Sequence, residues 1–568
     1  MTPTRWILLA LLFRLIAAGT QISTGHPDEW FQTVEFGNYL AFGFLGQTNE
    51  FLLHMRNLTW PTLLAAPLKL SHWIAPENLF LRLYAVKILT GLLDLLMIWG
   101  FSKLLETETS WPRRWKTATW ALFILPWFTI ADSVRPSQEH LSAIACWFTL
   151  GLLALIDTSN LKKNLLLAGT GICIILTGAF RYPSGLLGLG ILVALLLRRS
   201  IKNKGTPLLK TRWIFLGLIL GLGLGGLADW IFYGRPWESL WMYLQYNVFT
   251  GISRRDFGSQ PALATYLTYF KGYLGGIFIP IGLACTALIP IGLFQGISRL
   301  QPWAFATSFY LIGHFFISHK EPRFMAPIFF LTLWAFLQGA WIIQQFLSDS
   351  LKRICFAVLC IVAVLNTALL ARALWGETWK AGSNYLELGS LLKQNPACAI
   401  ITVRRPVSTL LPWNQAGHVP EPALAYFPAP AHQPSSQNMA SLPLIWIERQ
   451  PTCFAGSFVL FQPQQPEYFF EQIAGCKILK AGPLKFFSQS NQVNWIERKW
   501  VTAPWYSCPS SILLFFKQQE TRRILVKSLF PMIRLPEFGV SAEEFIYTAQ
   551  KGIDPSQIAT HDATLGDF

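Results

Sequence analysis

The stretch WILLALLFRLIAAGTQI (Trp6–Ile22), followed closely by GHPDEWFQ (Gly25–Gln32), decides the fold of this chain. Its first part is apolar and long enough to enter a bilayer, so it predicts a membrane helix. Pro27 disfavours the helical conformation at the residue before it, and this helix should therefore end ahead of the proline. Two adjacent carboxylates, Asp28 and Glu29, follow where the first span ends. Alone, this pair is equally typical of a solvated acidic turn at the start of the next helix.

The composition is that of a polytopic membrane protein. Of the 568 residues, 52% are hydrophobic and only 13% are charged, against about 25% charged residues in an ordinary soluble protein. Several apolar runs reach the roughly 18 residues that a membrane span requires. The net charge of +16 does not indicate a nucleic-acid partner, because the basic residues cluster in short connections between the apolar runs. That pattern orients membrane proteins.

The apolar runs predict eleven membrane spans, of which 184–198 is also short enough to be re-entrant. They lie near 6–22, 84–102, 117–131, 139–157, 164–180, 184–198, 213–231, 273–296, 302–318, 325–346 and 354–374. The first run carries Arg14 in its middle and lacks a small-residue cleavage site, so it is interpreted as a retained span. With the N-terminus cytoplasmic, the inner connections hold Lys and Arg at the higher density. Every unusual polar cluster then lies on the outer face.

The chain is predicted to divide near residue 375. Residues 1–375 form a transmembrane domain, whose long first outer loop at 23–83 suits amphipathic helices in the membrane interface. Beyond it, Pro, Gln, Asn and Ser become frequent and long apolar runs stop. We therefore expect a small extracytoplasmic α/β or α+β domain at 376–517 and a polar tail at 518–568. The strand-like segments are Ala399–Val403, Leu444–Ile447, Phe458–Phe461 and Ile512–Phe516.

The position of the ionisable residues separates a transporter from an enzyme. Transporters place such groups near the membrane midplane, and the candidates at that depth are Arg14, Asp94 and His314. Each of these three is also typical of a satisfied structural residue. The other clusters lie at span ends, at headgroup depth, which suits an enzyme whose lipid-linked substrate has its phosphate at the interface. A carboxylate would serve there as general base, and Lys, Arg and His would bind the leaving phosphate.

Two short motifs carry a family resemblance. His26-Pro27-Asp28-Glu29, with Phe31-Gln32 after it, resembles the first-loop motif of the α-mannosyltransferases that use dolichyl- or polyprenyl-phosphate mannose. These enzymes have the GT-C fold, form glycosyltransferase family 22, and build GPI anchors and N-glycan precursors. His319-Lys320-Glu321-Pro322-Arg323-Phe324 is similar to the family's second signature, His-Lys-Glu-x-Arg-Phe. The resemblance covers about residues 10–375 and makes this part the catalytic domain.

Weaker matches follow in the same order along the chain. Glu50 with Arg56 resembles the Trp-Glu and Arg-Ser elements of the family, although Asn49 and Asn57 replace the Trp and the Ser. The segment from Arg135 to Glu139 resembles an Arg-x-x-x-Asn-x-x-Glu region without its Asn. Arg181-Tyr182-Pro183 resembles Arg-Phe-Pro, and Asn247 lies in a segment that resembles a later loop of the family.

The resemblance implies transfer of mannose with inversion at the sugar carbon, giving an α-mannoside. It implies that Asp28 is the general base, that Glu29 positions the acceptor or substitutes for Asp28, and that cations bind the donor phosphate. These cations are His319, Lys320 and Arg323, with Arg135 as a weaker candidate. The supporting residues are His26, Glu50, Arg56, Glu139, Arg181, Asn247 and Glu321. The implied partners are a polyprenyl-phosphate-linked sugar donor, a glycolipid or glycan acceptor, and membrane lipid.

No cofactor is expected, and without an Asp-x-Asp pair or a His/Cys ligand cluster a required metal is not indicated. Three alternatives stay open. A flippase or transporter of lipid-linked sugars would need charges at Arg14, Asp94 or His314, and a lipid-binding scaffold should tolerate Asp28→Asn. A transferase could also use another polyprenyl-phosphate sugar. The outer face is expected to be either the periplasmic face of a bacterial inner membrane or the lumenal face of the ER membrane.

Overall fold

The structure is a computed structural model that describes part of the chain. The described residues are 2–20, 29–42, 54–75, 79–158, 163–202, 211–250, 261, 264–267, 270, 279–317, 320, 322–354, 356–357, 360 and the strands given below. The chain divides into two compact units. The first comprises Met1–Gln21, Glu50–Leu64 and Tyr84–Glu377, and the second comprises Ile22–Asn49, Ala65–Leu83 and Thr378–Phe568. All the site contacts described below lie within the first unit.

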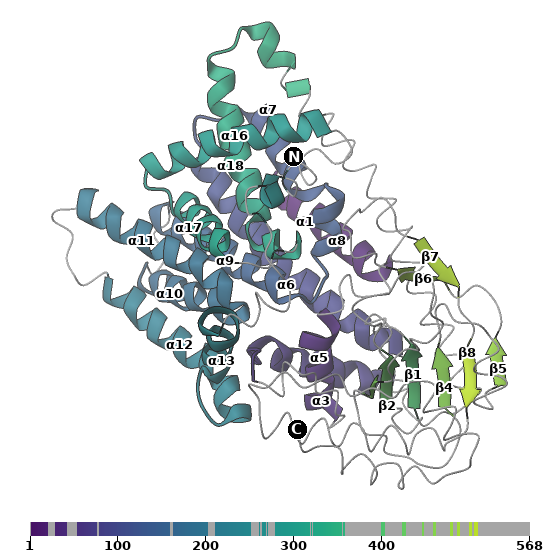
Figure 1. Ribbon diagram of the computed structural model, residues 1–568. Helices are drawn as coiled ribbons and strands as arrows, with labels where there is room; N and C mark the ends of the chain where they lie inside the picture. The colour runs from purple at the N-terminus through teal and green to yellow at the C-terminus, as the bar shows by residue number, and fades with distance from the viewer. Residues whose placement is uncertain are drawn as a thin grey trace. The chain divides into compact units, whose positions relative to one another are not determined.

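The described chain up to Gln345 is helical (Figure 1). The α-helices are α1 (Pro3–Thr20), α3 (Glu35–Phe42), α5 (Thr59–Ile74), α6 (Leu79–Thr107), α7 (Arg113–Ile124), α8 (Trp127–Asp132), α9 (Gln138–Thr158), α10 (Lys163–Phe180), α11 (Gly185–Lys202), α12 (Thr211–Tyr233), α13 (Glu238–Leu244), α16 (Ile279–Ser298), α17 (Pro302–Phe316) and α18 (Ala326–Gln345). Short π-helical turns are η1 (Trp30–Val34) and η4 (Gln245–Phe249), and 3₁₀ turns are η2 (Tyr182–Ser184) and η5 (Pro322–Met325).

The helices confirm an integral membrane protein. Within the described residues, six helices are long and apolar enough to cross a bilayer, and all six coincide with predicted spans. They are Pro3–Thr20, Leu81–Thr107, Gln138–Ile156, Lys163–Phe180, Arg212–Tyr233 and Arg323–Gln345. Shorter apolar helices, Tyr182–Arg198 and Cys285–Ser298, overlap the predicted spans at 184–198 and 273–296. The total of eleven spans stays a prediction.

The predicted span near 117–131 is wrong as a single helix. Helix α7 ends at Ile124, and α8 begins at Trp127 after Pro126, whose φ of −57° and ψ of 143° are not helical. Leu125, directly before the proline, still has helical dihedral angles (φ −87°, ψ −22°), so the break occurs at Pro126 itself, which cannot donate the backbone hydrogen bond of a continuing helix. The turn brings Ile130 and Val134 into one buried apolar cluster with Ala17 and Ala18 of α1.

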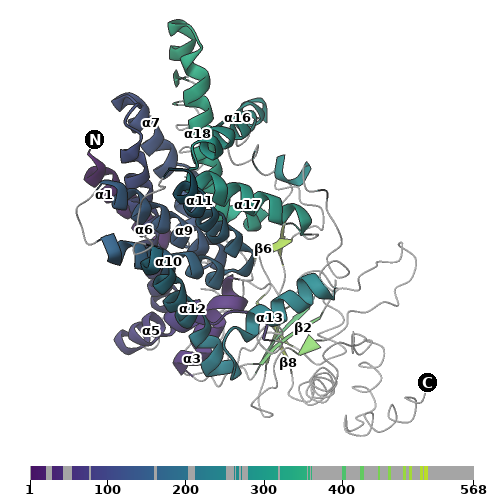
Figure 2. The same ribbon diagram turned by 90° about the vertical axis from the view of Figure 1, so that its left-hand side faces the viewer.

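Close helix contacts hold the first unit together. Helix α10 packs against α9, α11 and α12, while α17 packs against α11 and α16 against α18, as Figures 1 and 2 show. Glycines permit two of these approaches. A Cβ on Gly217 of α12 would lie 2.0 Å from the Ala168 carbonyl oxygen of α10, and one on Gly292 of α16 would lie 1.9 Å from that of Ala335 in α18. Membrane helices use such small residues because close backbone packing replaces the hydrophobic driving force available in water.

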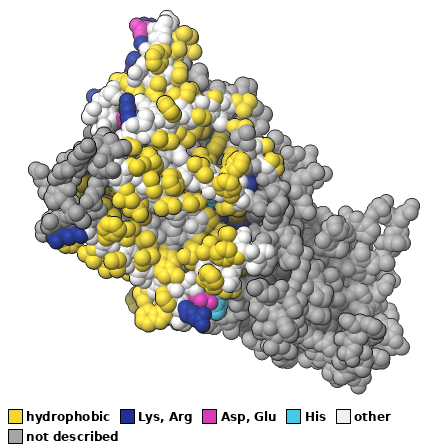
Figure 3. All heavy atoms as spheres, turned by 60° about the vertical axis from the view of Figure 1, so that its left-hand side comes forward, with side chains coloured by type: hydrophobic (Ala, Val, Ile, Leu, Met, Phe, Trp, Pro, Cys, Tyr) yellow, Lys and Arg dark blue, Asp and Glu magenta, His cyan; other side chains and the backbone are white. Residues whose placement is uncertain are grey.

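One face of the first unit is covered by hydrophobic side chains, with most of its charged side chains toward the edges of the view (Figure 3). Large exposed side chains of the helices include Phe215 and Ile219 on α12, Leu189 on α11 and Phe316 on α17. A contiguous apolar surface of this kind is unfavourable against water. It is the surface expected of helices that face lipid acyl chains.

The second unit contains the strands. They are β1 (Ala399–Val403), β2 (Ala423–Phe427), β3 (Trp446–Ile447), β4 (Phe458–Phe461), β5 (Lys477–Lys480), β6 (Lys485–Ser488), β7 (Lys499–Thr502) and β8 (Trp505–Cys508). Six form a mixed sheet in the order β3-β2-β1-β4-β8-β5, in which β1 is parallel to both of its neighbours, while β6 and β7 form an antiparallel pair. Three predicted strand segments coincide with or contain β1, β3 and β4. The fourth, Ile512–Phe516, lies outside the described residues, and the domain bounds 376–517 and 518–568 stay predictions.

Candidate functional site

A buried ion pair joins the start of α9 to the end of α10. Helix α10 ends at Phe180, and Arg181 takes an extended conformation (φ −150°, ψ 118°) ahead of the 3₁₀ turn Tyr182–Ser184. The Arg181 guanidinium leaves the helix axis there and donates from Nη1 to Oε1 of Glu139, in the first turn of α9. Both side chains are less than a tenth exposed. A charge-assisted bond in such surroundings fixes the positions of both groups.

The loop after α17 lies against the same arginine. The Arg181 guanidinium carbon lies 4.4 Å from the ring centroid of Phe324, and that of Arg323 lies 5.2 Å from it. Both distances permit cation–π attraction. The Tyr310 hydroxyl of α17 donates to the Phe324 carbonyl oxygen, which holds the turn in place. Residues of the signature loop therefore lie beside the Arg181–Glu139 pair.

Lys320 adds a further cation to this loop. Its side chain is buried, and Nζ donates to the carbonyl oxygen of Ile317. Burial lowers the pKa of the Lys320 ammonium from its ordinary value, because the charged form loses solvation.

Several cations lie around Glu139. The positive charges of Arg181, Arg323 and Arg56 all stabilise its carboxylate electrostatically. Arg181 and Lys320 likewise both act on His314 of α17, so the ammonium lies in the same region. Arg56, Arg181 and Arg323 thus act on Glu139 together, with Lys320 close to this cluster. Cations gathered in this way can bind an anionic group.

A hydrogen-bond network holds the segment that carries Arg56. Asp229, near the end of α12, accepts from the backbone nitrogens of Leu58 (3.5 Å) and Ser239 (3.1 Å). The Tyr233 hydroxyl donates to the carbonyl oxygen of Arg56 at 3.2 Å, and the amide of Asn57 donates to the Gly225 carbonyl oxygen at 2.9 Å. These contacts fix the backbone from the Arg56 carbonyl to Leu58.

A polar recess opens between these elements. Its lining residues come from the Arg56 segment, the start of α9, the end of α10 and α13. They are Met55, Arg56, Asn57, Gln138, Phe180, Arg181, Tyr182, Pro183 and Tyr243. Burial raises the pKa of the Tyr243 phenol, which therefore stays protonated at neutral pH.

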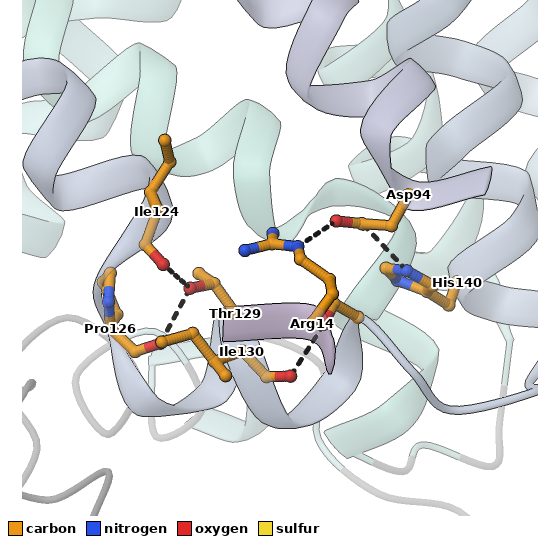
Figure 4. Close-up of polar contacts among 8 residues, drawn as sticks. Arg14, Asp94, Ile124, Pro126, Thr129, Ile130 and His140 are labelled. Atoms are coloured by element: carbon orange, nitrogen blue, oxygen red, sulfur yellow. Dashed lines mark hydrogen bonds and ion pairs between the residues drawn. The ribbon is translucent and has the colours of Figure 1, made fainter. Parts of the chain in front are cut away.

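A second buried ion pair lies deeper in the first unit (Figure 4). Nε of Arg14, on α1, donates to Oδ2 of Asp94, on α6, at 2.8 Å, and Nε2 of His140, on α9, lies 3.0 Å from Oδ1 of Asp94. All three side chains are at most 3% exposed. Asp94 thus already has two partners within the protein, which is what a structural residue inside a membrane requires.

Proteins of similar sequence and structure indicate the family of this chain. The profile of the Alg9-like mannosyltransferase family matches residues 5–378, well over half of the chain and the whole of the region that holds the site. The chain belongs to the Alg9-like mannosyltransferase family. The resemblance inferred from the two motifs is thereby confirmed.

Curated relatives of this family member are similar at low identity. The GPI alpha-1,2-mannosyltransferase 3 of Xenopus laevis is 23% identical over 331 residues, which is 57% of this chain and 58% of that protein. The GPI mannosyltransferase 3 of Drosophila melanogaster is 26% identical over 337 residues, 58% of this chain and 54% of that protein. The chain therefore matches a little over half the length of these relatives.

A solved structure shares the fold. The crystal structure of ArnT from Cupriavidus metallidurans bound to undecaprenyl phosphate superposes with a TM-score of 0.52 and 10% sequence identity, covering 89% of this chain and 97% of that one. At this identity the likeness concerns the fold alone. It confirms the GT-C fold expected for the Alg9-like family member.

The structure places some of the predicted site residues and leaves others undescribed. His26, Asp28, Glu50, His319 and Glu321 lie outside the described residues. Glu29 is buried and directly precedes the π-helical turn η1 in the second unit. π-Helical turns are frequent at functional sites, so this turn is consistent with a functional role for the stretch.

Seven further predicted residues have defined contacts. Arg56, Glu139, Arg181 and Arg323 are brought together as described above, with Lys320 beside them. Arg135 instead pairs with Asp132 at 2.7 Å, and both side chains are about a quarter exposed. The Asn247 amide donates to the Tyr243 carbonyl oxygen at 3.0 Å within the π-helical turn η4. The structure thus links Asn247 to a recess residue and gives Arg135 a local acidic partner.

Sequence reasoning missed several residues of the site. Gln138 and Tyr243 carry no motif of their own. The Tyr182 hydroxyl shares a hydrogen bond with Ser239, which in turn donates to Asp229, and these three positions are far apart in the sequence. Two of these residues could have been found from their position in the sequence, because Gln138 directly precedes Glu139 and Tyr182 directly follows Arg181.

Proposed function

We propose that this family member is an inverting membrane mannosyltransferase. It transfers mannose from a polyprenyl-phosphate-mannose donor to a lipid-linked or glycan acceptor and forms an α-mannoside. The names of the curated relatives, GPI mannosyltransferase 3, support the transferred sugar and a glycolipid acceptor. The undecaprenyl phosphate bound to the structural relative supports a polyprenyl-phosphate donor.

One observation carries this proposal. Arg56, Arg181 and Arg323 act on Glu139 at the ends of membrane helices, with Lys320 in the same region, and two of these cations lie against Phe324 of the signature loop. The departing group of the reaction is a lipid phosphate. Preorganised positive charge is worth most where negative charge develops in the transition state. A cluster of cations therefore fits the release of a phosphate better than it fits a neutral ligand.

The reaction consists of one displacement. The oxygen of an acceptor hydroxyl attacks C1 of the mannosyl phosphate from the face opposite the phosphate, and Asp28 takes the hydroxyl proton. The bond between C1 and the phosphate oxygen breaks, and its electrons stay on the polyprenyl phosphate. Lys320 and Arg323, with the predicted partner His319, stabilise the added charge, so no proton has to be supplied to the leaving group. The site is proposed to face away from the cytoplasm, which follows from the higher density of Lys and Arg in the opposite connections.

Substitution of Asp28 tests the function directly. The experiment measures transfer of radiolabelled mannose from polyprenyl-phosphate mannose in membranes, with the amount of protein matched by immunoblot. Asp28→Asn keeps the shape of the side chain but removes the base, so the rate should fall by about 10²–10⁴-fold. Asp349→Asn is the matched control, since Asp349 is exposed and pairs with Lys352 at 3.0 Å on the surface.

The companion variant Glu29→Gln separates the two carboxylates. A smaller loss than that of Asp28→Asn assigns proton transfer to Asp28, and a larger loss exchanges the two roles. Normal transfer by both variants would falsify the assignment of this motif and favour a scaffold. A wild-type protein that moves lipid-linked sugars without transferring them is a transporter. A wild-type protein that transfers only a different sugar from its polyprenyl phosphate corrects the donor.

A further inference from the structure

The polar recess beside Arg181 has no role in the displacement described above. It is narrow, with room for a group about the size of a water molecule. Its walls include Gln138 from the first turn of α9 and Arg181 from the end of α10, which are 6% and 8% exposed. The recess is therefore a buried, polar position of limited size next to the cationic cluster.

Two donor groups of these walls have no acceptor. Within the described part of the chain, Nε2 of Gln138 and Nε of Arg181 are buried and make no hydrogen bond. Buried donors without a partner are costly and rare in folded proteins. The recess can thus receive an oxygen atom that the described residues do not supply.

A hydroxyl oxygen suits the recess better than a phosphate oxygen. The charge of Arg181 is already compensated by Glu139, whose carboxylate would repel a further anion placed beside it. The side-chain amide of Gln138 can both donate and accept a hydrogen bond, and a sugar hydroxyl can do the same. A phosphodiester oxygen can only accept.

We propose that this recess receives one hydroxyl group of a hexose substrate, and that Gln138 is the residue that recognises it. The proposal rests on the function proposed above and extends it to sugar specificity. The position favours the mannose of the donor. Arg181 lines the recess and also lies against Phe324 beside Arg323, a residue proposed to bind the donor phosphate. Because the sugar ring of a sugar phosphate is bonded directly to the phosphate, the ring of the donor would lie close to the recess. A sugar of the acceptor presents the same chemistry, and the test separates the two sources.

The test compares substrates that each lack one hydroxyl. Polyprenyl-phosphate mannose and its 2-, 3-, 4- and 6-deoxy analogues are assayed as donors with the wild-type protein and with Gln138→Leu. A site that binds a hydroxyl rejects the analogue without it, so the wild type should lose about 10–100-fold in kcat/KM on one deoxy donor. Gln138→Leu should use mannose and that analogue about equally. A parallel series with deoxy acceptor sugars shows whether the hydroxyl belongs to the acceptor instead.

Two further variants make the result interpretable. Gln138→Met keeps the approximate size of the side chain but has no amide to donate or accept, and it should lose the same discrimination even if Gln138→Leu folds poorly. Gln345→Leu, at an exposed position at the end of α18, is the matched control and should keep the wild-type ratios. Loss of discrimination in either substrate series supports the proposal.

Unchanged ratios in both Gln138 variants, or an equal loss on every substrate, would mean that the recess holds water only and would overturn it. This outcome differs from failure of the proposed function, in which the wild-type protein transfers no mannose to any acceptor.

Discussion

Two buried arginine–carboxylate pairs meet at the first turn of α9, yet their surroundings differ. Arg14 and Asp94 pair at 2.8 Å, with His140 as a third member. Arg181 pairs with Glu139, the residue directly before His140. Successive residues of a helix point about 100° apart, because one turn takes 3.6 residues. The start of α9 is therefore held on one side by Asp94 of α6 and on another by the end of α10.

The difference lies in the number of charges that act on each carboxylate. The described contacts of Asp94 are one arginine and one histidine, one at each of its two oxygens, and Arg14–Asp94 is termed the balanced pair. Glu139 is acted on by Arg56 and Arg323 in addition to its partner Arg181. Clustered charges around an ion pair are typical of a functional site, whereas a pair that contacts little else is typical of a structural one. The surrounding charges, more than burial, thus separate the two pairs.

Removing one partner of the balanced pair should have the largest effect on folding. Asp94→Asn leaves Arg14 charged and uncompensated in the membrane interior, which is expected to cost about 3–5 kcal/mol. The readouts are membrane yield and thermal stability in detergent. Asp132→Asn is the matched control, because it also removes an Arg–Asp contact. The Arg135–Asp132 pair has a similar distance, 2.7 Å, but its side chains are about a quarter exposed. That loss should stay within about 1 kcal/mol. Equal losses in the two variants would contradict the structural role of Asp94.

Sequence reasoning found the residues of the second pair but not the pairing. The motifs named Glu139, Arg181, Lys320 and Arg323 because their residue types and order resemble a family, and the structure brings these four side chains together. No local rule links Glu139 to Arg181, since the contact depends on how α9 packs against α10. Gln138 was missed for the same reason, because its proposed role depends on the recess that it lines and not on its neighbours in sequence.

The pairing of Arg14 with Asp94 could not be predicted from the sequence either. Their sequence context left both a structural role and a transport role open, and only the fold shows that each has the other as its partner. The break between α7 and α8 was different, because its signal was local. Pro126 interrupts the apolar run, and its missing backbone N–H marks the point where the predicted span at 117–131 divides.

Removing one cation of the cluster around Glu139 should impair function and spare the fold. Arg323→Ala is expected to reduce kcat/KM for the polyprenyl-phosphate donor by about 10–100-fold, since a hydrogen bond to a charged group is worth roughly 1.5–3 kcal/mol. The loss should appear as a raised KM for the donor, with the KM for the acceptor nearly unchanged. Arg235→Ala, at an exposed position after α12, is the control. A reduced membrane yield with a normal donor KM would instead show that the loop only anchors the protein.

The pH dependence of donor binding tests the contribution of a single cation, Lys320. Burial lowers the pKa of its ammonium, so the cation is lost at a pH below the roughly 10.4 of an ordinary lysine. Donor binding should weaken as the pH rises through this lowered value. The free energy of unfolding should instead increase with pH. Between the lowered pKa of Lys320 in the folded protein and its ordinary pKa in the unfolded chain, the unfolded chain binds more protons, so rising pH makes unfolding less favourable.

Arginine at this position should abolish both trends. Lys320→Arg keeps its charge throughout this range, so its alkaline loss of donor kcat/KM should move to higher pH or disappear. The measurement is the ratio of kcat/KM between the variant and the wild type from about pH 7 to 10, with detergent melting curves at the same pH values. Parallel alkaline losses in both proteins would assign the titration to a group other than Lys320.

Removing both partners of the balanced pair should have the smallest effect of all. The Arg14 guanidinium is buried with Nη1 and Nη2 making no hydrogen bond within the described residues, so the pair recovers only part of its desolvation cost. Replacing such a pair with apolar side chains is often neutral or stabilising. Arg14→Leu combined with Asp94→Leu should therefore lie within about 1 kcal/mol of the wild type and should transfer mannose at a nearly normal rate. The double variant and both single variants form a cycle whose coupling energy isolates the pair. A double variant that folds normally but no longer transfers mannose would place Arg14 and Asp94 in the functional class with Glu139 and Arg181, and the distinction drawn from the surrounding charges would then be wrong.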